Sequence, residues 1–349
     1  MAATLKDIAR ETGLSIATVS KYMNGATLKE KNRIAIERAV KKLDYTVNEY
    51  ARGLKSNKSR TIGVVIPELS NLFITQIITK MEDILRNSGY SVIICDCHTD
   101  ESLECKAVQF LLGKRVDGII NMPVCKDGRH LQPAIAKGIP VVLIDRTIPQ
   151  LGSVCDCVLI DNAGAANAAT KYLLENGHRN IGIIIGPSDI FTSQHRLQGY
   201  KNALAEYGIA PAEHLIAYSD YTVQGGYESM FGLLCANNGM TAVFVTNYEM
   251  TLGSIIAANE HNIKIPQELS FIGFDNMDLA RVTHPKLTIV SQPLEEIGMH
   301  VAKVMLDRLT GGNKGAPISV SLSTSLQYGA SVCHINQIQS KKQSEEPSK

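Results

Sequence analysis

The chain has 349 residues, of which 44% are hydrophobic and 20% charged, as in ordinary globular proteins with room for two or three domains. No apolar run approaches the ~18 residues that a membrane span needs. The N-terminal sequence "MAATLKDIAR" lacks the apolar segment of a secretory signal. We therefore expect a cytoplasmic protein whose eight cysteines are reduced thiols.

Charge is distributed unevenly along the chain. Residues 1–60 hold thirteen Lys and Arg against six Asp and Glu, which leaves 22 of the 35 basic and 28 of the 34 acidic residues for the remainder. A basic segment attached to a mildly acidic body predicts that the segment binds a polyanion and the body does not.

The first 45 residues predict three short helices. "LKDIARETG" ends at Gly13, "SIATVSKYMNG" begins at Ser15 and ends at Asn24-Gly25, and "KEKNRIAIERAVKKL" has helical apolar spacing. Only the turn "TGLS" separates the first two helices. Two such helices in a basic segment predict a helix-turn-helix DNA-binding domain, with a purely structural helical hairpin as the alternative.

The second of these helices has the side chains that a recognition helix needs. Short residues near its N-terminus allow close approach to the major groove, and Lys21 lies one turn beyond them. We expect Lys21 to contact guanine, although a lysine lacks the bidentate fork of arginine.

From Thr61 the pattern changes to apolar runs that alternate with amphipathic helices. The first series contains "TIGVVIP", "SVIICDC", "VDGIINMP" and "PVVLID", and the second contains "NIGIIIGP", "LIAYS", "TAVFVT" and "LSFIGFD". Strands buried on both faces and separated by helices predict an α/β body with parallel sheets in two subdomains. Strands near "CVLIDN", "LTIVSQP" and "ISVSLSTS" are expected to cross between them. Ligands bind at the carboxyl ends of such strands, so a cleft between the two lobes is the expected site.

These patterns predict the following boundaries: a helix-turn-helix domain at 1–46, a linker at 47–60, a body at 61–334 and a disordered tail at 335–349. Within the body, the N-subdomain comprises about 61–161 and 292–320, and the C-subdomain about 162–291 and 321–334.

The order of several motifs resembles the lactose/purine repressor family of bacterial transcription regulators over about residues 4–331. The motifs are "ATVSKYMNG", "ARGL", "PVVLIDR", "GHRNIGIIIG", "RLQGY", "GFDN" and "VSQPLEEIG". The resemblance implies a homodimer on a pseudo-palindromic operator, a small effector in the cleft, and a hinge in "NEYARGLKS" that becomes helical on DNA and inserts a leucine into the minor groove. The residues then expected at or near DNA are Thr4, Ser15, Ile16, Ala17, Thr18, Ser20, Lys21, Asn24, Ala51 and Leu54.

The body is also similar to the periplasmic ribose-binding proteins, which implies a set of effector contacts. These are Asn71, Phe73, Asp145, Arg146, Arg196, Tyr221, Asn247, Asp275 and Gln292. Such acids, arginines and amides suit a ring of hydroxyls, and aromatics suit its C–H faces. Ile74 and Tyr248 depart from the ribose-type pattern, so a pentose or hexose is favoured without ribose being specified. The alternative is that some of these residues only support the fold.

The sequence gives little support for a metal site or an enzyme. The pairs Cys95/Cys97 and Cys155/Cys157 have one intervening residue rather than the two or more usual for zinc, so we expect no metal and no cofactor. No phosphate-binding glycine loop or nucleophile elbow occurs. His178 in "ENGHRN" is expected to close a helix rather than act as a base.

The resulting hypothesis is a transcriptional repressor of carbohydrate-metabolism genes, controlled by a monosaccharide or a derivative. Two alternatives stay open: a regulator that needs a phosphocarrier-protein corepressor, and one that senses a purine or nucleoside. The sequence leaves open the sign of the effector's action and the operator.

Overall fold

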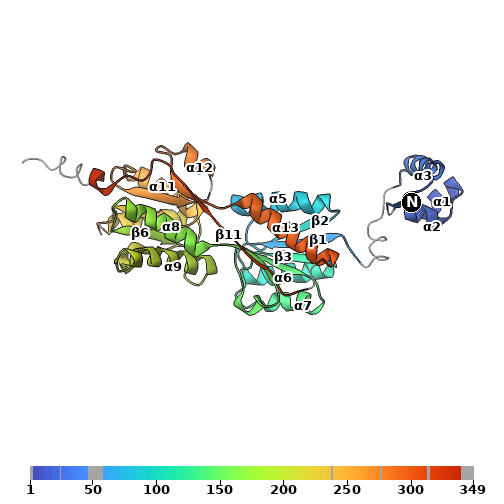
Figure 1. Ribbon diagram of the computed structural model, residues 1–349, viewed down its shortest axis with the longest axis horizontal. Coiled ribbons are helices and arrows are strands. Elements are labelled where there is room, and N and C mark those ends of the chain that lie inside the picture. Colours follow the sequence, from blue (N-terminus) through green and yellow to red (C-terminus); the bar gives the residue numbers. More distant parts are fainter. Residues whose placement is uncertain are drawn as a thin grey trace, which may run out of the picture. The chain divides into compact units, whose positions relative to one another are not determined.

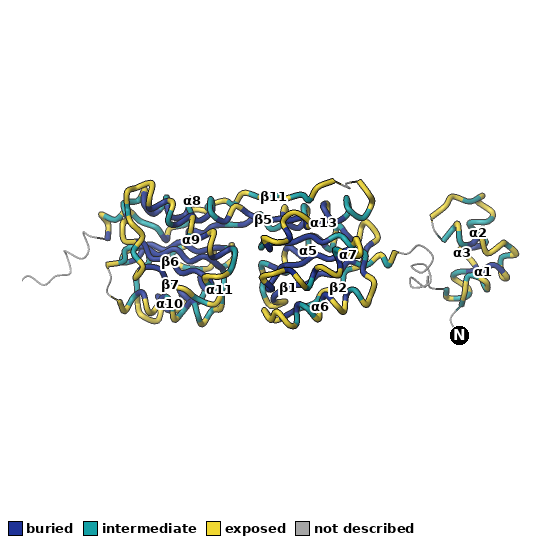
Figure 2. Tube along the Cα trace, turned by 90° about the horizontal axis from the view of Figure 1, so that it is seen from below, coloured by how far each residue is buried: buried dark blue, intermediate teal, exposed yellow. Residues whose placement is uncertain are grey.

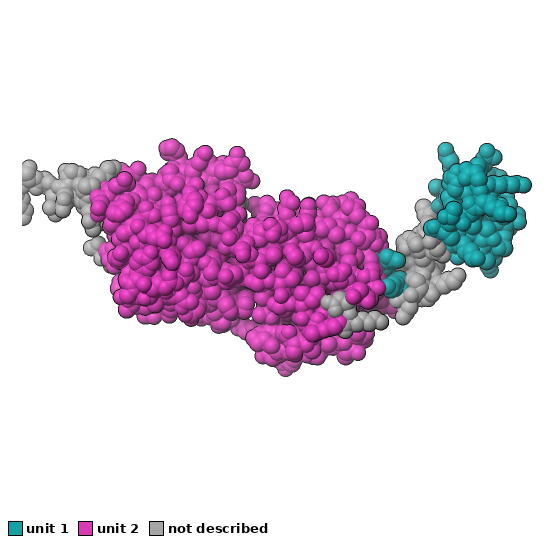
Figure 3. Space-filling model, in the orientation of Figure 1, with its two compact units in different colours: residues 1–60 teal, residues 61–349 magenta. Residues whose placement is uncertain are grey.

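The computed structural model describes residues 3–23, 25–45, 58–236, 239–275, 277–312 and 315–338. They belong to two compact units, residues 1–60 and residues 61–349, which Figure 3 colours separately. Among the described helices, none combines the length and the apolar character that crossing a bilayer requires.

The small unit is a head of three helices. They are α1 (Leu5–Thr12), α2 (Ile16–Met23) and α3 (Glu30–Lys42). The carboxylate of Asp7 accepts the Thr4 N–H at 2.9 Å at the start of α1, and the Ser15 hydroxyl accepts the Thr18 N–H at 3.2 Å at the start of α2. Gly13 ends α1 with a φ of 67°, which glycine adopts without strain. The predicted helices and the Ser15 cap are thereby confirmed.

The large unit contains two six-stranded sheets, one per lobe. The first has the order β11-β5-β4-β3-β1-β2 and every pairing is parallel. Its strands are β1 (Thr61–Ile66), β2 (Ser91–Asp96), β3 (Gly118–Asn121), β4 (Val141–Ile144), β5 (Asp156–Ile160) and β11 (Ser319–Leu322). In β1, Ile62 and Val64 join one apolar cluster while Val65 joins another, because alternate side chains point to opposite faces. The edge strand β2 is an exception to the expected double burial, since Ile94 is 39% exposed.

The second sheet has the order β12-β10-β9-β8-β6-β7. Its strands are β6 (Ile181–Ile185), β7 (Ile216–Tyr218), β8 (Ala242–Val245), β9 (Ser270–Phe274), β10 (Thr288–Ser291) and β12 (Ser325–Gln327). All pairings are parallel except that of β10 with β12. The tube in Figure 2 shows buried strands in the middle of each lobe, whereas the edge strands β2, β11, β7 and β12 are more exposed.

Helices cover both faces of each sheet (Figure 1). In the first lobe, α5 (Leu72–Asn87) packs with α13 (Leu294–Thr310), while α6 (Glu101–Gly113) and α7 (Gln132–Ala136) cover the other face. In the second lobe the pairs are α8 (Asn162–Glu175) with α9 (Phe191–Glu206), and α10 (Val223–Cys235) with α11 (Tyr248–Glu260). The short α12 (Met277–Val282) contacts β10, and 3₁₀ turns lie at Arg129–Leu131, Pro149–Leu151 and Glu213–Leu215.

The chain crosses between the lobes three times, after β5, after β10 and between β11 and β12. The sequence predicts one crossing strand in the segment "ISVSLSTS". The segment instead contains β11 and the start of β12, which belong to different sheets and are separated by Ser323 and Thr324.

The expected disordered tail begins too early. Residues 335–338 form a helical turn in which Ile338 is only 1% exposed, and the Ile335 N–H donates to the Asn176 carbonyl at 2.9 Å. Burial of an isoleucine holds this turn on the second lobe. Residues 339–349 lie outside the described part of the chain, as do residues 47–57 of the predicted hinge.

Candidate functional site

Helix α2 and the Ser15 that caps it carry six of the ten residues predicted to contact DNA. Ser15, Ile16, Ala17 and Lys21 are exposed, whereas Val19 is fully buried against α1 and α3. Ala17 and Lys21 are four positions apart and so lie on one side of the helix. Thr4 caps α1, and Thr18 and Ser20 are half-buried. Asn24, Ala51 and Leu54 lie outside the described residues.

Contacts with α3 fix the orientation of α2. The Tyr22 hydroxyl donates to Glu37 at 2.8 Å, and Arg33 contacts both Glu37 and Glu30 at 2.6 Å. Exposed ion pairs contribute little stability individually, but this network joins two helices and supports the angle at which α2 presents its outer face.

The larger unit holds a cavity of about 310 Å³ between its two lobes, near the lower limit of small-molecule pockets. Every predicted effector contact lines it: Asn71, Phe73, Asp145, Arg146, Arg196, Tyr221, Asn247, Asp275 and Gln292. Five of them come within two residues of the end of a strand: Asp145 and Arg146 follow β4, Asn247 follows β8, Asp275 follows β9 and Gln292 follows β10. Parallel sheets of two facing lobes thus bring residues together that are far apart in the sequence.

Arg196 is held rigidly in the wall of this cavity. Its side chain is buried, Nε donates to Asn162 Oδ1 at 2.8 Å, and one terminal nitrogen donates to the Thr246 carbonyl. The guanidinium lies 4.0 Å from the centre of the Phe274 ring. A buried arginine fixed in this way is pre-oriented for hydrogen bonding and does not have to be ordered by a ligand.

Asp145 and Arg146 provide a second charged pair on the opposite lobe. Arg146 Nε lies 3.3 Å from Asp145 Oδ2, and Arg146 Nη1 donates to the Pro123 carbonyl at 3.5 Å. Asp145 has a φ of 64° and Asp275 a φ of 62°, an uncommon conformation for a residue with a side chain. Strained backbone at two facing acids is typical of sites where side-chain direction matters more than stability.

Burial disfavours ionisation of the acids deepest in the cavity. It raises the pKa of Asp275 to about 7, although nearby Arg196 and a 2.8 Å hydrogen bond from Gln292 Nε2 favour the carboxylate. Burial likewise raises the pKa of Glu249. Gln292 Oε1 is buried without a partner among the described residues. These groups can all accept hydrogen bonds from a hydroxylated ligand.

Glu249 is a cavity residue that sequence reasoning missed. One of its carboxylate oxygens accepts from Asn71 Nδ2 at 2.8 Å and the other from Asn247 Nδ2 at 2.6 Å. The first bond joins the two lobes, because Asn71 precedes α5 and Glu249 lies in α11. Its position two residues after a predicted contact is the only signal that would have identified it. Glu68, His98, Thr192 and Asp220 were also missed.

Tyr221 offers its ring rather than its hydroxyl. The hydroxyl is within 2.9 Å of Thr192 Oγ1 and 2.6 Å of Ser193 Oγ. The ring packs on Gly186, where an added Cβ would lie 2.1 Å from it. The predicted aromatic contact is therefore held as a flat apolar wall, suited to the C–H face of a ring.

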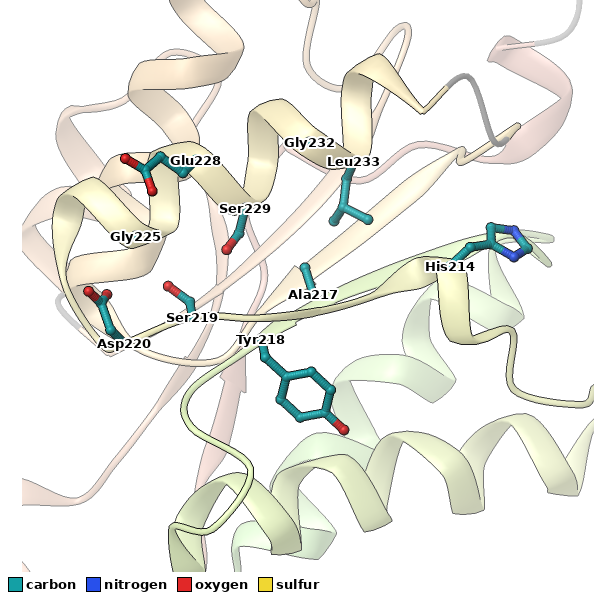
Figure 4. Close-up of a pocket in the computed structure, with 10 residues that line it drawn as sticks. All are labelled: His214, Ala217, Tyr218, Ser219, Asp220, Gly225, Glu228, Ser229, Gly232 and Leu233. Carbon is teal, nitrogen blue, oxygen red and sulfur yellow. The ribbon is translucent and has the colours of Figure 1, made fainter.

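A second hollow of about 560 Å³ lies over β7 and α10 (Figure 4). It is lined among others by Ser219, Asp220, Glu228 and Ser229, and none of the predicted effector contacts borders it. Figure 4 shows Tyr218 pointing away from α10. The interlobe cavity is smaller but more enclosed, and it brings together arginines and acids from both lobes, so it is the better candidate.

The structure shows what His178, predicted to close a helix, contacts. His178 is fully buried, and its two ring nitrogens lie 3.0 Å from Thr241 Oγ1 and from the Cys333 carbonyl. It thus links separate segments and does not simply close the end of α8.

Burial raises the pKa of Cys97 and that of Cys155 each to about 12, so both remain protonated thiols.

Comparisons with known proteins cover both units. Residues 4–48 match the family model for bacterial regulatory proteins of the lacI family, and residues 170–332 match a periplasmic binding protein-like domain. The chain is 35% identical to the HTH-type transcriptional repressor CytR of Escherichia coli K12, over 90% of this chain and 92% of that protein.

Two solved structures are informative. A LacI family transcriptional regulator from Enterococcus faecium with bound ribose is 28% identical, with a TM-score of 0.70 over 78% of this chain and 99% of that one. The lac repressor dimer bound to operator and the anti-inducer ONPF has a TM-score of 0.85 at 24% identity, over 95% of this chain and 100% of that one, and so supports the fold.

Proposed function

Because the chain belongs to the lacI family of bacterial regulatory proteins, we propose that it is a repressor of carbohydrate-metabolism genes that a monosaccharide or a close derivative controls. Membership confirms the resemblance inferred from the sequence, together with the fold: a helix-turn-helix head and a body like the periplasmic binding proteins. The family consists of DNA-binding transcription regulators rather than enzymes.

The observation that carries the sugar proposal is the chemistry of the interlobe cavity. Arg146 and Arg196 donate, while Asp145, Asp275 and Glu249 accept, so adjacent hydroxyls of a sugar ring find both kinds of partner. Phe73 and Tyr221 supply apolar walls. A ligand that lacks one hydroxyl leaves buried polar groups unpaired and is rejected. The ribose-bound relative has a comparable fold.

A purine or nucleoside is the alternative ligand class. Two aromatic residues also suit a flat base, but three acids and two arginines around about 310 Å³ give a base more charged partners than it has polar atoms. We therefore favour the sugar, and both classes enter the test.

Allosteric control follows from the two-lobed arrangement. Phe73, Asp145 and Arg146 lie on one lobe, and Arg196, Tyr221 and Asp275 on the other, so a ligand that contacts both sets favours lobe closure. The heads of a homodimer on a pseudo-palindromic operator would read that change through the hinge. Whether closure weakens or strengthens operator binding is decided by measurement.

The test is a thermal-shift screen of purified protein against monosaccharides, their phosphates, purines and nucleosides, followed by operator gel shifts with any ligand found. A ligand at 100 times its Kd stabilises the folded state by about 2.7 kcal/mol. Lys21→Ala is a matched control, because it should lose operator affinity yet keep the ligand-induced shift. Stabilisation by a purine alone, with no response to any sugar, contradicts the sugar proposal.

The corepressor alternative has its own readout. Gel shifts are repeated with a phosphocarrier protein added, with and without the ligand. Tight operator binding by the purified protein alone argues against a required corepressor, whereas binding only in its presence supports one.

A further inference from the structure

The first lobe contains a buried cluster of polar residues away from the cleft lining. Glu104 on α6 is fully buried and faces the loop that follows β3. Its Oε2 accepts the backbone N–H groups of Val124 at 3.0 Å and Cys125 at 2.5 Å, and its Oε1 accepts from Asn121 Nδ2 at 2.8 Å. His130 Nε2 lies 3.2 Å from the same Oε1, and the His130 side chain is 1% exposed.

Sulfur atoms complete the cluster. Ligand atoms of Glu104, Cys125 and His130 all lie within 4.8 Å of one another, the only such group of His, Cys, Asp and Glu found in the described part of the chain. Cys105 is adjacent to Glu104 on α6, and its Sγ lies 3.9 Å from Cys125 Sγ. Two thiolates bound to one tetrahedral zinc at about 2.3 Å lie about 3.8 Å apart, which is close to the distance between these two sulfurs. Cys105 lies outside the group of mutually close ligand atoms, so its thiol would have to approach Glu104 and His130.

Cys125 Sγ donates to the Glu101 carbonyl at 3.4 Å, but hydrogen bonding within the described protein leaves two other atoms of the cluster unpaired. His130 Nδ1 and Asn121 Oδ1 are buried and have no partner among the described residues. Buried polar atoms without partners are rare, and they often indicate an ion or another bound group. A structural brace for residues 122–130 would explain the bonds to Glu104, but it would not explain two adjacent sulfurs beside a partly unpaired histidine.

A divalent cation would suit these donors, because it stabilises both a carboxylate and a thiolate.

We propose that Glu104, Cys125 and His130 bind a divalent transition-metal ion such as Zn²⁺, with Cys105 as the fourth ligand. One carboxylate, one imidazole and two thiolates form a tetrahedral donor set of the kind that zinc prefers. Each thiol that binds releases its proton to solvent. Cys105 is partly exposed and marks the side from which the ion enters.

The proposed ion would act on a segment that reaches the effector cavity. Met122 lines that cavity, the Pro123 carbonyl accepts from Arg146, and Lys126 forms an ion pair with Asp189 of the other lobe. Residues 122–126 therefore run from the metal ligands to one wall of the cleft. A bound ion would hold this wall in place.

Binding is measured on the untagged, reduced full-length chain with Zn²⁺ by calorimetry and with Co²⁺ by absorption spectroscopy. One equivalent should bind, with proton release in buffers of different ionisation enthalpy, a thiolate-to-cobalt charge-transfer band and the visible bands of tetrahedral cobalt. Cys125→Ser and His130→Gln should each weaken Zn²⁺ binding by more than ~100-fold, which is the upper range for loss of an indirect contact. Cys105→Ser should reduce the charge-transfer intensity.

Cys95→Ser is the matched control, since this partly exposed thiol lies outside the cluster. Thermal unfolding checks that each variant folds, and Zn²⁺ should raise the Tm of the wild type and Cys95→Ser but not that of Cys125→Ser. The proposal is overturned if the wild type binds no Zn²⁺, or if folded Cys125→Ser binds Co²⁺ with an unchanged spectrum.

Discussion

If the proposed effector contacts Asp275, the ionisation of this carboxyl should control effector affinity. Burial raises its pKa to about 7, so near neutral pH this carboxyl is divided between its two forms. A sugar hydroxyl that donates to the carboxylate binds only the ionised form, and binding must then expel a proton below pH 7. The apparent Kd is the intrinsic value multiplied by 1 + 10^(pKa − pH), which predicts about a tenfold loss of affinity between pH 8 and pH 6.

The variant Asp275→Asn should remove the part of that pH dependence that Asp275 contributes and should weaken effector binding at pH 8. The amide side chain of this variant would keep an acceptor for Gln292 but lose the charge, and a hydrogen bond to a charged group contributes about 1.5–3 kcal/mol. We therefore expect about a 10- to 150-fold higher Kd at pH 8. Titration calorimetry from pH 6 to pH 8 on both proteins measures the two effects together.

The stability of the apo protein should depend on pH in the opposite direction to its affinity for the effector. A carboxyl whose pKa rises on folding binds its proton more tightly in the folded state, so stability falls as pH rises from 3.8 through about 7. Asp275→Asn removes this cost and should stabilise the apo protein at pH 8, on the order of 2 kcal/mol. This is about half of the free energy that the full pKa shift would give, because the Asp275 side chain is only partly buried. Asp278→Asn, at an exposed position, is the control and should change neither effector affinity nor stability.

The reasoning is refuted if effector affinity is flat from pH 6 to pH 8 in the wild type. It is also refuted if Asp275→Asn binds the sugar as tightly as the wild type at pH 8, because the carboxylate would then contact no hydroxyl. A destabilised variant would show that the buried charge is compensated within the apo protein.

Three further predictions concern the heads, the hinge and the cavity wall. Lys21→Ala should lower operator affinity by roughly 1–3 kcal/mol in a gel shift, and an equal loss on random DNA would reduce Lys21 to a phosphate contact. In the hinge, which lies outside the described residues, Leu54→Ala should weaken operator binding strongly. Gly53→Ala should tighten operator binding, because alanine favours a helix by ~1 kcal/mol relative to glycine. Unchanged affinity of the Leu54 variant would mean that the segment only connects the head to the body. Gly186→Ala places a Cβ 2.1 Å from the Tyr221 ring and should weaken effector binding while circular dichroism shows an intact fold; wild-type affinity would mean that the ring contributes no wall.

Local sequence patterns were sufficient to predict the fold, because most helices and strands have a recognisable cap, turn or apolar run. The capping residue Ser15 and the turn at Gly13 locate the first two helices, and apolar runs such as 181–185 locate the strands. The sequence was ambiguous where the pairing between strands determines where a strand begins or ends. The segment that contains β11 and β12 reads as one strand, and only its two different neighbours, β5 and β10, divide it.

The candidate site was predictable to the extent that it resembles a known pattern. Residues such as Asp145 and Asn247 follow strand ends and match sugar-contact positions, and all the predicted contacts line one cavity. Glu249 was missed because its role depends on Asn71, 178 positions away in the sequence, on the other lobe. Glu104 and Cys125 were missed for the same reason, since only the packing of α6 against a loop brings them together. Long-range proximity of polar groups leaves no periodic signal.

The three crossings between the lobes have a consequence for synthesis of the protein. The first lobe receives its last strand only at Ser319–Leu322, and the second lobe closes even later with Ser325–Gln327. Neither sheet is complete until almost the whole chain has left the ribosome, whereas the head at residues 1–60 emerges first. A nascent or prematurely terminated chain can thus carry a finished DNA-reading head on a body that is unable to respond to any effector.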